Sequence, residues 1–248
     1  MPHDPDDWDG LWSEYKDSAE RNPARSYRRG LMLRILGRST TSREMRLLDV
    51  GSGPGDFLRD AADHFPAAEM LGIELSEVGV EYAKQLAPRA EFLQRDLVED
   101  AEAPDRFAAW ATHVVCCEVL EHVDDPVRLL ENASAYMADG ARIVVTVPGG
   151  PVTAFDRHIG HRAHFSRARL RETLEAAGFQ VETVMAAGFP FFNLYKIVVL
   201  LMGDRVIGQG ESPSRAASVV LRVFGVLFRL NLRRRLGWQM VAVARFSG

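Results

Sequence analysis

The chain has 248 residues, of which 47% are hydrophobic and 26% are charged, and its formal net charge is -4. This composition is typical of a globular protein, and the acidic balance argues against broad, sequence-independent binding to nucleic acid. The two cysteines, Cys116 and Cys117, are adjacent in an apolar run. Their position excludes an internal disulfide framework and favours a reducing compartment. The first residues are acidic without an apolar core, and no apolar run reaches the ~20 residues that a membrane-spanning helix needs. We therefore expect a cytoplasmic protein.

Residues 1–42 are polar at first and then weakly helical, which predicts an N-terminal helical extension before one domain over 43–248. In that domain, short apolar runs alternate with helical patterns. The expected strands are 46–51, 68–75, 90–97, 112–120, 141–149, 180–189 and 238–246, and the expected helices are 55–65, 76–87, 125–137 and 166–179. This alternation predicts an α/β fold, a doubly wound and mostly parallel sheet with helices on both faces. Ligands of such sheets bind beyond the carboxyl ends of the strands.

A glycine-rich loop follows the first expected strand, where "LLDVGSGPG" places Asp49 before Gly51, Gly53 and Gly55. Glycines let the backbone turn tightly and let a ligand approach without a Cβ in the way. A dinucleotide-binding fingerprint would have glycine where Asp56 stands. An acid at that position would repel a pyrophosphate, but it would not repel a sulfonium cofactor that carries an amine. The same glycines could also serve only the packing of a tight strand-to-helix turn.

Two further acids end the next two expected strands. Glu74 ends the second strand, where a carboxylate can bind both hydroxyls of a ribose, and Asp96 ends the third, where an acid can accept from an adenine amino group. Either acid alone could be a solvated loop residue. Three acid-bearing strand ends in order, behind a glycine loop, favour a cofactor that contains a nucleoside.

The motifs "LLDVGSGPG", "GIEL", "RDL" and "CCEVLEHVDDP" together resemble those of the class I S-adenosylmethionine-dependent methyltransferases. The resemblance covers residues 45–185, and the last strand returns at 238–246. It implies a seven-stranded sheet of order 3-2-1-4-5-7-6 whose seventh strand is antiparallel. The cofactor-binding residues that it implies are Asp49, Gly51, Ser52, Gly53, Gly55, Glu74, Leu75, Asp96, Leu97, Cys117 and Glu118.

The stretch "CEVLEH" at 117–122 would place Glu118, Glu121 and His122 on one face of a helix. One interpretation is an ordinary helix start, where acids favour the N-terminus and the histidine packs. A second is a divalent metal site, because carboxylate and imidazole donors suit Mg²⁺, Mn²⁺ or Zn²⁺. A third makes a histidine the general base of methyl transfer. For that role His161 and His158 are the first candidates, because they follow the fifth strand on the substrate side, and His122 is the third.

Two narrower resemblances bear on these alternatives. "CEVLEHVDDP" looks like the ubiquinone-biosynthesis O-methyltransferases. The spacing Glu-x-x-Glu-His, followed by His-x-x-x-aromatic-Ser, resembles the small-RNA 3′-terminal 2′-O-methyltransferases, which hold a metal with such residues. That second resemblance implies a metal set of Glu118, Glu121, His122 and His161.

A long apolar insertion lies at about 188–235, between the sixth and seventh expected strands. Its aromatic residues, Phe189, Phe191, Phe192 and Tyr195, are the predicted walls of the acceptor pocket. Arginines recur every seven residues from Arg215 in a helical pattern that is otherwise broadly apolar. Such a helix must be buried in the protein, in a dimer partner or against lipid headgroups. Core or lid packing is the default, and a homodimer or a peripheral membrane contact through 215–235 is the alternative.

These observations predict methyl transfer from S-adenosylmethionine to a small molecule, at an aromatic, quinone-like or natural-product hydroxyl. The alternative is N- or carboxyl methylation of a natural product or a modified peptide. RNA 2′-O-methylation is disfavoured by the negative charge. A non-catalytic cofactor-binding scaffold is disfavoured by the intact glycine loop with Glu74 and Asp96.

Overall fold

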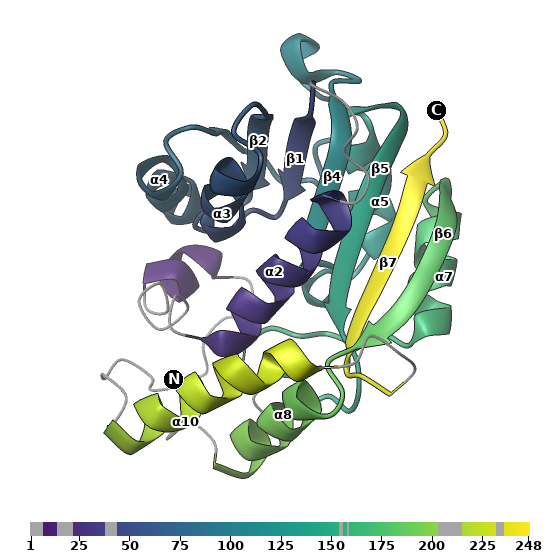
Figure 1. Cartoon of the computed structure of the whole chain (residues 1–248). Helices are drawn as coiled ribbons and strands as arrows, with labels where there is room; N and C mark the ends of the chain where they lie inside the picture. Colours follow the sequence, from purple (N-terminus) through teal and green to yellow (C-terminus); the bar gives the residue numbers. More distant parts are fainter. Residues whose placement is uncertain are drawn as a thin grey trace.

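The structure is a computed structural model that describes residues 7–13, 22–37, 44–153, 156–157, 159–202, 215–231 and 236–248. The strands are β1 (Arg46–Val50), β2 (Glu69–Glu74), β3 (Glu91–Gln94), β4 (Ala111–Cys117), β5 (Met137–Pro148), β6 (Phe179–Ala187) and β7 (Gln239–Phe246). They form one sheet in the order β3-β2-β1-β4-β5-β7-β6 (Figure 1). The strands from β3 to β5 pair in parallel, whereas β7 is antiparallel to both β5 and β6. The predicted strand order and the antiparallel seventh strand are therefore confirmed.

Three of the helices start at capping residues in the sequence. The α-helices are α2 (Pro23–Gly37), α3 (Asp56–His64), α4 (Glu77–Leu86), α5 (Pro126–Ser134), α7 (Arg167–Ala176), α8 (Phe191–Met202) and α10 (Arg215–Leu227), and the 3-10 helices are η1 (Asp105–Phe107), η2 (Leu120–His122) and η3 (Phe228–Leu230). The Ser76 hydroxyl caps α4 by accepting from the Gly79 N–H at 2.9 Å, and Ser166 caps α7 in the same way. Asp125 caps α5, whose first residue is Pro126. These caps satisfy N–H groups that have no partner inside the helix.

Consecutive residues of a strand point to opposite faces of the sheet, and each face packs against helices. The sheet therefore has a buried core on both faces. Leu48 of β1 and Val114 of β4 belong to one core cluster with α5 and α7. Their neighbours Leu47 and Val115 belong to a second cluster with α2, α3 and α4. Helix α2 thus covers one face of the sheet, and it crosses β4 and β5 in Figure 1.

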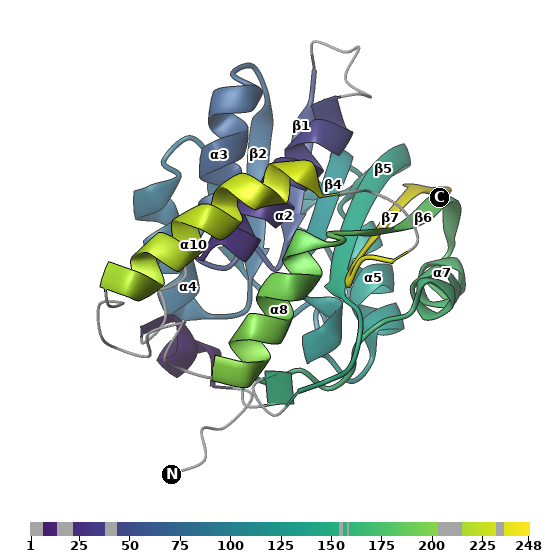
Figure 2. The same ribbon diagram turned by 60° about the horizontal axis from the view of Figure 1, so that its bottom comes forward.

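The apolar insertion forms a separate cover at the end of the sheet. Helices α8 and α10, with η3, pack around Phe192, Tyr195, Phe224 and Phe228, which form a third buried cluster. We call α8, α10 and η3 the cap. Figure 2 shows α8 and α10 in front of the sheet, and α10 also contacts α2. None of the described helices combines the length and hydrophobicity needed to cross a bilayer.

Candidate active site

A cavity of about 320 Å³ lies beyond the carboxyl ends of β1 and β4, and the cap forms part of its wall. Its volume falls in the range of small-molecule sites, roughly 300–1,000 Å³. Lining residues include Trp8, Trp12, Arg25, Arg28, Asp49, Gly51, Ser52, Gly53, Cys117, Glu118, Glu121, His122, Asp156, His161, Tyr195, Lys196 and Leu200. The site thus combines the predicted glycine loop and the turn after β4 with groups from α2 and from residues 8–13.

The glycine loop needs glycine for conformation and for space. Gly51, Gly53 and Gly55 have φ values of 67°, 53° and 85°, in the left-handed region that other residues rarely adopt. A Cβ on Gly51 would lie 2.4 Å from Val119, and one on Gly53 would lie 2.9 Å from the Trp12 ring. Val119 and the Trp12 ring therefore occupy the space that side chains at Gly51 and Gly53 would need.

Glu74 is tied to the glycine loop rather than exposed to solvent. Its Oε2 accepts from the Gly53 N–H at 2.8 Å, and its Oε1 accepts from the Ser76 N–H at 3.1 Å. Burial raises the pKa of Glu74, and these backbone hydrogen bonds oppose that rise. The carboxylate thus joins the ends of β1 and β2, where the ribose was predicted, but it does not line the cavity itself.

The other residues predicted to contact the nucleoside also lie outside the cavity. Asp96 accepts from the Val98 N–H at 2.8 Å, Leu97 is buried, and Leu75 is exposed at the surface. Gly55 is likewise absent from the lining, whereas Asp49, Gly51, Ser52, Gly53, Cys117 and Glu118 are present in it. The cavity therefore brings together residues that were predicted to contact the methionine portion of the cofactor.

The turn after β4 differs from the predicted helix. Glu118 has a φ of 58°, and only Leu120–His122 are helical, as the 3-10 helix η2. Glu118, Glu121 and His122 therefore do not share one α-helical face. The Glu118 carboxylate lies 3.4 Å from the Arg28 guanidinium of α2 and accepts from Gln239 of β7 at 2.7 Å.

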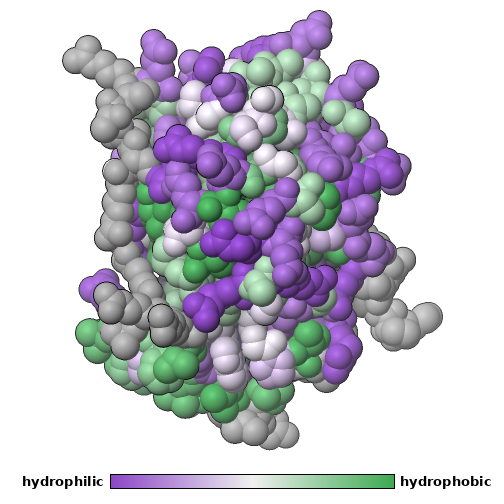
Figure 3. All heavy atoms as spheres, turned by 90° about the vertical axis from the view of Figure 1, so that its right-hand side faces the viewer, coloured by the Kyte–Doolittle hydropathy of each residue, from purple (hydrophilic) through white to green (hydrophobic). Residues whose placement is uncertain are grey.

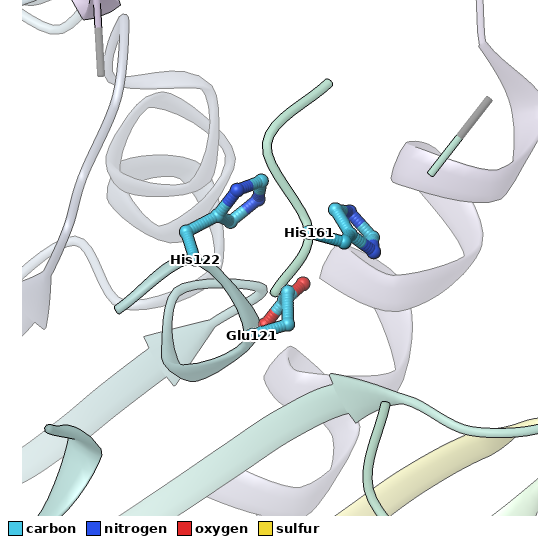
Figure 4. Close-up of side chains that lie close together, drawn as sticks. All are labelled: Glu121, His122 and His161. Atoms are coloured by element: carbon cyan, nitrogen blue, oxygen red, sulfur yellow. The ribbon is translucent and has the colours of Figure 1, made fainter. Parts of the chain in front are cut away.

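Glu121, His122 and His161 nevertheless converge on one space (Figure 4). One ligand atom from each lies within 4.8 Å of the others. Glu121 is fully buried, and neither of its carboxylate oxygens has a hydrogen-bond partner in the described part of the chain. Burial, together with the nearby Glu118 charge, raises the pKa of Glu121 well above its usual range. Glu118, which was predicted as a fourth ligand, lies outside this group.

His122 is also enclosed. Its Nδ1 is buried and has no partner among the described atoms, and the Trp8 ring packs edge-on against it at 4.8 Å. Burial lowers the pKa of His122 to about 4. The imidazole is therefore neutral at physiological pH.

The hydrogen bonds of His164 fix the tautomer of His161. His164 Nδ1 lies 3.1 Å from the Gly150 carbonyl oxygen, which can only accept, so this nitrogen carries a proton. In neutral His164 the Nε2 is then an acceptor, and His161 Nδ1, 3.0 Å away, must donate to it. Burial lowers the pKa of both histidines, that of His161 to about 2. This leaves His161 neutral, with a lone pair on Nε2 for which the described residues offer no hydrogen-bond donor, and the Asp156 carboxylate lies 3.9 Å from Nδ1.

The predicted aromatic walls are only partly present. Tyr195 lines the cavity, but Phe189, Phe191 and Phe192 do not. Phe192 is fully buried inside the cap, because the packing of α8 against α10 and η3 turns that face of α8 inward. His158 lies outside the described residues. Lys196, from the next position of α8, lines the cavity and was not predicted.

Residues 8–13 supply a contact that the sequence analysis also missed. The Ser76 hydroxyl donates to Asp9 Oδ1 at 2.5 Å, and the Val78 N–H donates to the same atom at 3.2 Å. Trp12 packs over Gly53, and the Arg25 guanidinium lies 5.4 Å from the centre of the Trp12 ring. The two tryptophans in the short acidic stretch "DPDDWDGLW" were the available signal.

Comparisons with known proteins agree on the family. The model of a methyltransferase domain matches residues 20–184, which is more than half of the chain. The ubiquinone biosynthesis O-methyltransferase of Coxiella burnetii is 29% identical over 111 residues, covering 45% of this chain and 47% of that protein. The trans-aconitate 2-methyltransferase of Paracidovorax citrulli is 29% identical over 147 residues, covering 57% of this chain and 50% of that one. The chain thus spans about half the length of the curated relatives it matches.

Solved structures show the same fold. A methyltransferase from Haloferax volcanii, in complex with the Trm112 activator, matches with a TM-score of 0.62 at 18% identity, covering 98% of this chain and 99% of that one. The phosphoethanolamine N-methyltransferase 2 of Haemonchus contortus, in complex with S-adenosyl-L-methionine, matches with a TM-score of 0.56 at 18% identity, covering 87% and 52%. The chain belongs to the methyltransferase-domain family, and its fold is that of these solved methyltransferase structures.

Proposed function

We propose that this methyltransferase methylates a hydroxyl oxygen of a small molecule with aromatic, quinone-like or natural-product character, and that His161 is the general base. The observation that carries the proposal is the neutral His161 in the cavity wall, whose Nδ1 proton is committed to His164 and whose Nε2 lone pair is free. Oxygen methylation releases the hydroxyl proton, and an unprotonated imidazole in the cavity wall is a group that can accept it. The burial that keeps His161 neutral also makes it a weaker base than an exposed histidine.

The reaction is an in-line displacement at the methyl carbon. The acceptor oxygen forms a bond to this carbon while the carbon–sulfur bond breaks, and the bonding electrons return to sulfur. S-Adenosylmethionine would supply the methyl group from its sulfonium and would be released as the neutral thioether, and His161 Nε2 accepts the hydroxyl proton. The positive charge moves from sulfur to the imidazole, where the Asp156 carboxylate stabilises it. The enzyme supplies mainly position and a proton acceptor.

The residues that we assign to the cofactor lie at or just after the carboxyl ends of β1 to β4. We assign the methionine portion to Asp49, Gly51, Ser52 and Gly53, with Cys117 and Glu118 beside it. The ribose belongs beside Glu74, and the adenine beside Asp96 and Leu97. Arg25 and Arg28 of α2 line the same cavity and can attract the carboxylate of the methionine portion.

The His161→Ala variant tests the base. We expect turnover to fall by about 100-fold or more, the usual contribution of a general base, while cofactor affinity stays unchanged in calorimetric titration. His64→Ala is the matched control, because His64 is exposed on α3. Full activity in His161→Ala would contradict the assignment.

A second candidate is a divalent metal held by Glu121, His122 and His161. It is favoured by the buried oxygens of Glu121 and the buried Nδ1 of His122, none of which has a partner among the described residues. A metal there would lower the pKa of an acceptor hydroxyl. It would also occupy the lone pair that His161 otherwise uses as a base, so the two roles of this histidine exclude each other.

Metal analysis separates these two versions of the site. If the metal acts, the purified protein contains one divalent ion per chain, chelation stops turnover, and Glu121→Gln lowers the metal content. If His161 is the base, turnover is unchanged in chelator. The His64→Ala variant again serves as the control for metal content.

Carboxyl or N-methylation is the remaining alternative. Arg28 and Lys196 line the cavity and would suit an acceptor that carries a carboxylate. A screen of acceptor mixtures with isotope-labelled cofactor methyl, read by mass, identifies the product. Label that mild alkali releases would indicate a methyl ester, whereas an ether or an amine would retain it.

A further inference from the structure

The exposed large hydrophobic side chains of the described residues are concentrated in one region. Apart from Leu75, they all belong to the cap or to the turn before β7: Leu194, Ile197, Leu200, Val219, Val220, Val223, Val226, Leu230 and Leu236. We call these residues the cap face. Figure 3 shows hydrophobic side chains along the bottom edge of the molecule, at the height where Figure 1 places α8 and α10. Large apolar patches on a protein surface mark interaction sites.

The cap helices are apolar on two faces. On α10, the inward Phe224 packs in the core of the cap, whereas Val219, Val223 and Val226 recur at helical spacing on the outer side. These three valines are 59%, 51% and 63% exposed. A helix that needed only to cover the active site would have a polar outer side. The apolar outer side of α10 therefore indicates that this helix contacts a second apolar surface, outside the cap.

The charged residues of the described cap helices have one sign. From 213 to 238 the sequence contains six arginines and no carboxylate, and from 183 to 203 its single charged residue is Lys196. Arg222 and Arg229 are exposed on α10 and η3, next to the valines. The whole chain carries a net charge of -4, so this positive region is local.

These charges decide between two occupants. In a symmetric dimer the same patch meets itself, which would place arginines against arginines without a carboxylate between them. An anionic lipid surface instead offers phosphates to the arginines and acyl chains to the valines. We infer that the cap face binds the surface of an anionic lipid bilayer as a peripheral contact.

Vesicle co-sedimentation of the full chain tests this inference. We expect at least about tenfold more binding to vesicles of phosphatidylcholine with phosphatidylglycerol than to phosphatidylcholine alone, and a loss of binding at high salt, which screens surface charge. The double variant Arg222→Glu, Arg229→Glu removes the charge, and Val223→Ser, Val226→Ser removes the apolar contact. Each should reduce binding by about tenfold or more.

The matched control is Arg167→Glu, Arg171→Glu on α7, which changes the net charge equally at exposed positions outside the cap face. It should bind vesicles like the unmodified chain. Equal sedimentation with and without anionic lipid, equal loss in the control variant, or a lipid-independent dimer in light scattering would each overturn the inference. Cofactor titration of every variant reports folding. Because vesicle binding requires no turnover, its failure is distinguishable from a failure of the proposed reaction.

Discussion

At the scale of single residues, two glycines show separately why a side chain can be unfavourable: the backbone conformation is strained, or there is no space for a Cβ. Gly51 combines a φ of 67° with a neighbour, Val119, only 2.4 Å from where a Cβ would stand. Gly140 has a φ of 74° with nothing within 4 Å of its Cβ position. The backbone strain is similar at the two positions, whereas only Gly51 lacks space for a Cβ and lines the cavity.

The pair Gly51→Ala and Gly140→Ala therefore isolates the steric effect. We expect Gly140→Ala to lower the free energy of unfolding by about 1–2 kcal/mol, the cost of the left-handed backbone, without changing cofactor affinity. Gly51→Ala should lower stability further, because Val119 must move, and should weaken cofactor binding by about tenfold or more. Chemical denaturation and calorimetry measure both. Equal cofactor affinity in the two variants would contradict the assignment of the methionine portion to this loop.

The turn after β4 shows where a sequence pattern fails for a local reason. The spacing of Glu118, Glu121 and His122 predicts a shared helical face, but Glu118 adopts a positive φ and turns toward Arg28. Periodicity contains no information about that single dihedral angle. The pairing of His161 with His164 could not be predicted either, because it depends on the carbonyl of Gly150 in a loop.

At the scale of elements, the strands were predictable and the phase of the cap helices was not. Short apolar runs bounded by turn residues located all seven strands, because strands buried on both faces are continuously hydrophobic. Helix α8 is apolar on nearly every side, so no periodic pattern in its sequence indicates which aromatic residues face the cavity. Tyr195 does, and Phe192 instead packs in the cap because α10 and η3 lie against it.

Residues 8–13 form an element of their own beside the glycine loop, and Trp8, Leu11 and Trp12 line the cavity. They are attached by Asp9 to the start of α4 and by Trp12 to Gly53. A short segment held by these few contacts can open and close more easily than the sheet beneath it. We therefore expect it to control access of the cofactor.

Trp12→Ala tests this role. The rate constants for association and dissociation of S-adenosylhomocysteine should both increase, by about threefold or more, because the cover is weakened while the binding residues remain. Stopped-flow fluorescence from the remaining tryptophans measures both rates. Trp110→Phe is the control, because Trp110 packs against Phe107 away from the cavity. An unchanged dissociation rate would show that Trp12 does not cover the bound cofactor.

At the scale of the whole molecule, α8 belongs both to the cavity wall and to the cap face. Lys196 and Leu200 line the cavity, and Leu200 is also 49% exposed on the outer surface. An acceptor with an apolar tail could therefore place its hydroxyl near His161 and its tail along α8. This arrangement favours amphiphilic acceptors over fully polar ones.

A matched pair of probes measures this preference. In the presence of S-adenosylhomocysteine, 4-octylcatechol should bind at least about tenfold more tightly than catechol, equivalent to burying roughly two methylene groups. Leu200→Ser should reduce the difference. Calorimetric titration gives both dissociation constants. Equal affinity of the two catechols would indicate that α8 contributes no apolar subsite.

The contacts of Glu118 join parts of the chain that are synthesised at different times. Its carboxylate joins Arg28, near the beginning of the described chain, to Gln239, on the last strand. On the ribosome, α2 and the glycine loop emerge long before β7, so this three-way contact is incomplete until translation is nearly finished. Until then the nascent protein lacks both Trp238 of the cavity wall and the Gln239 contact that holds the Glu118 carboxylate.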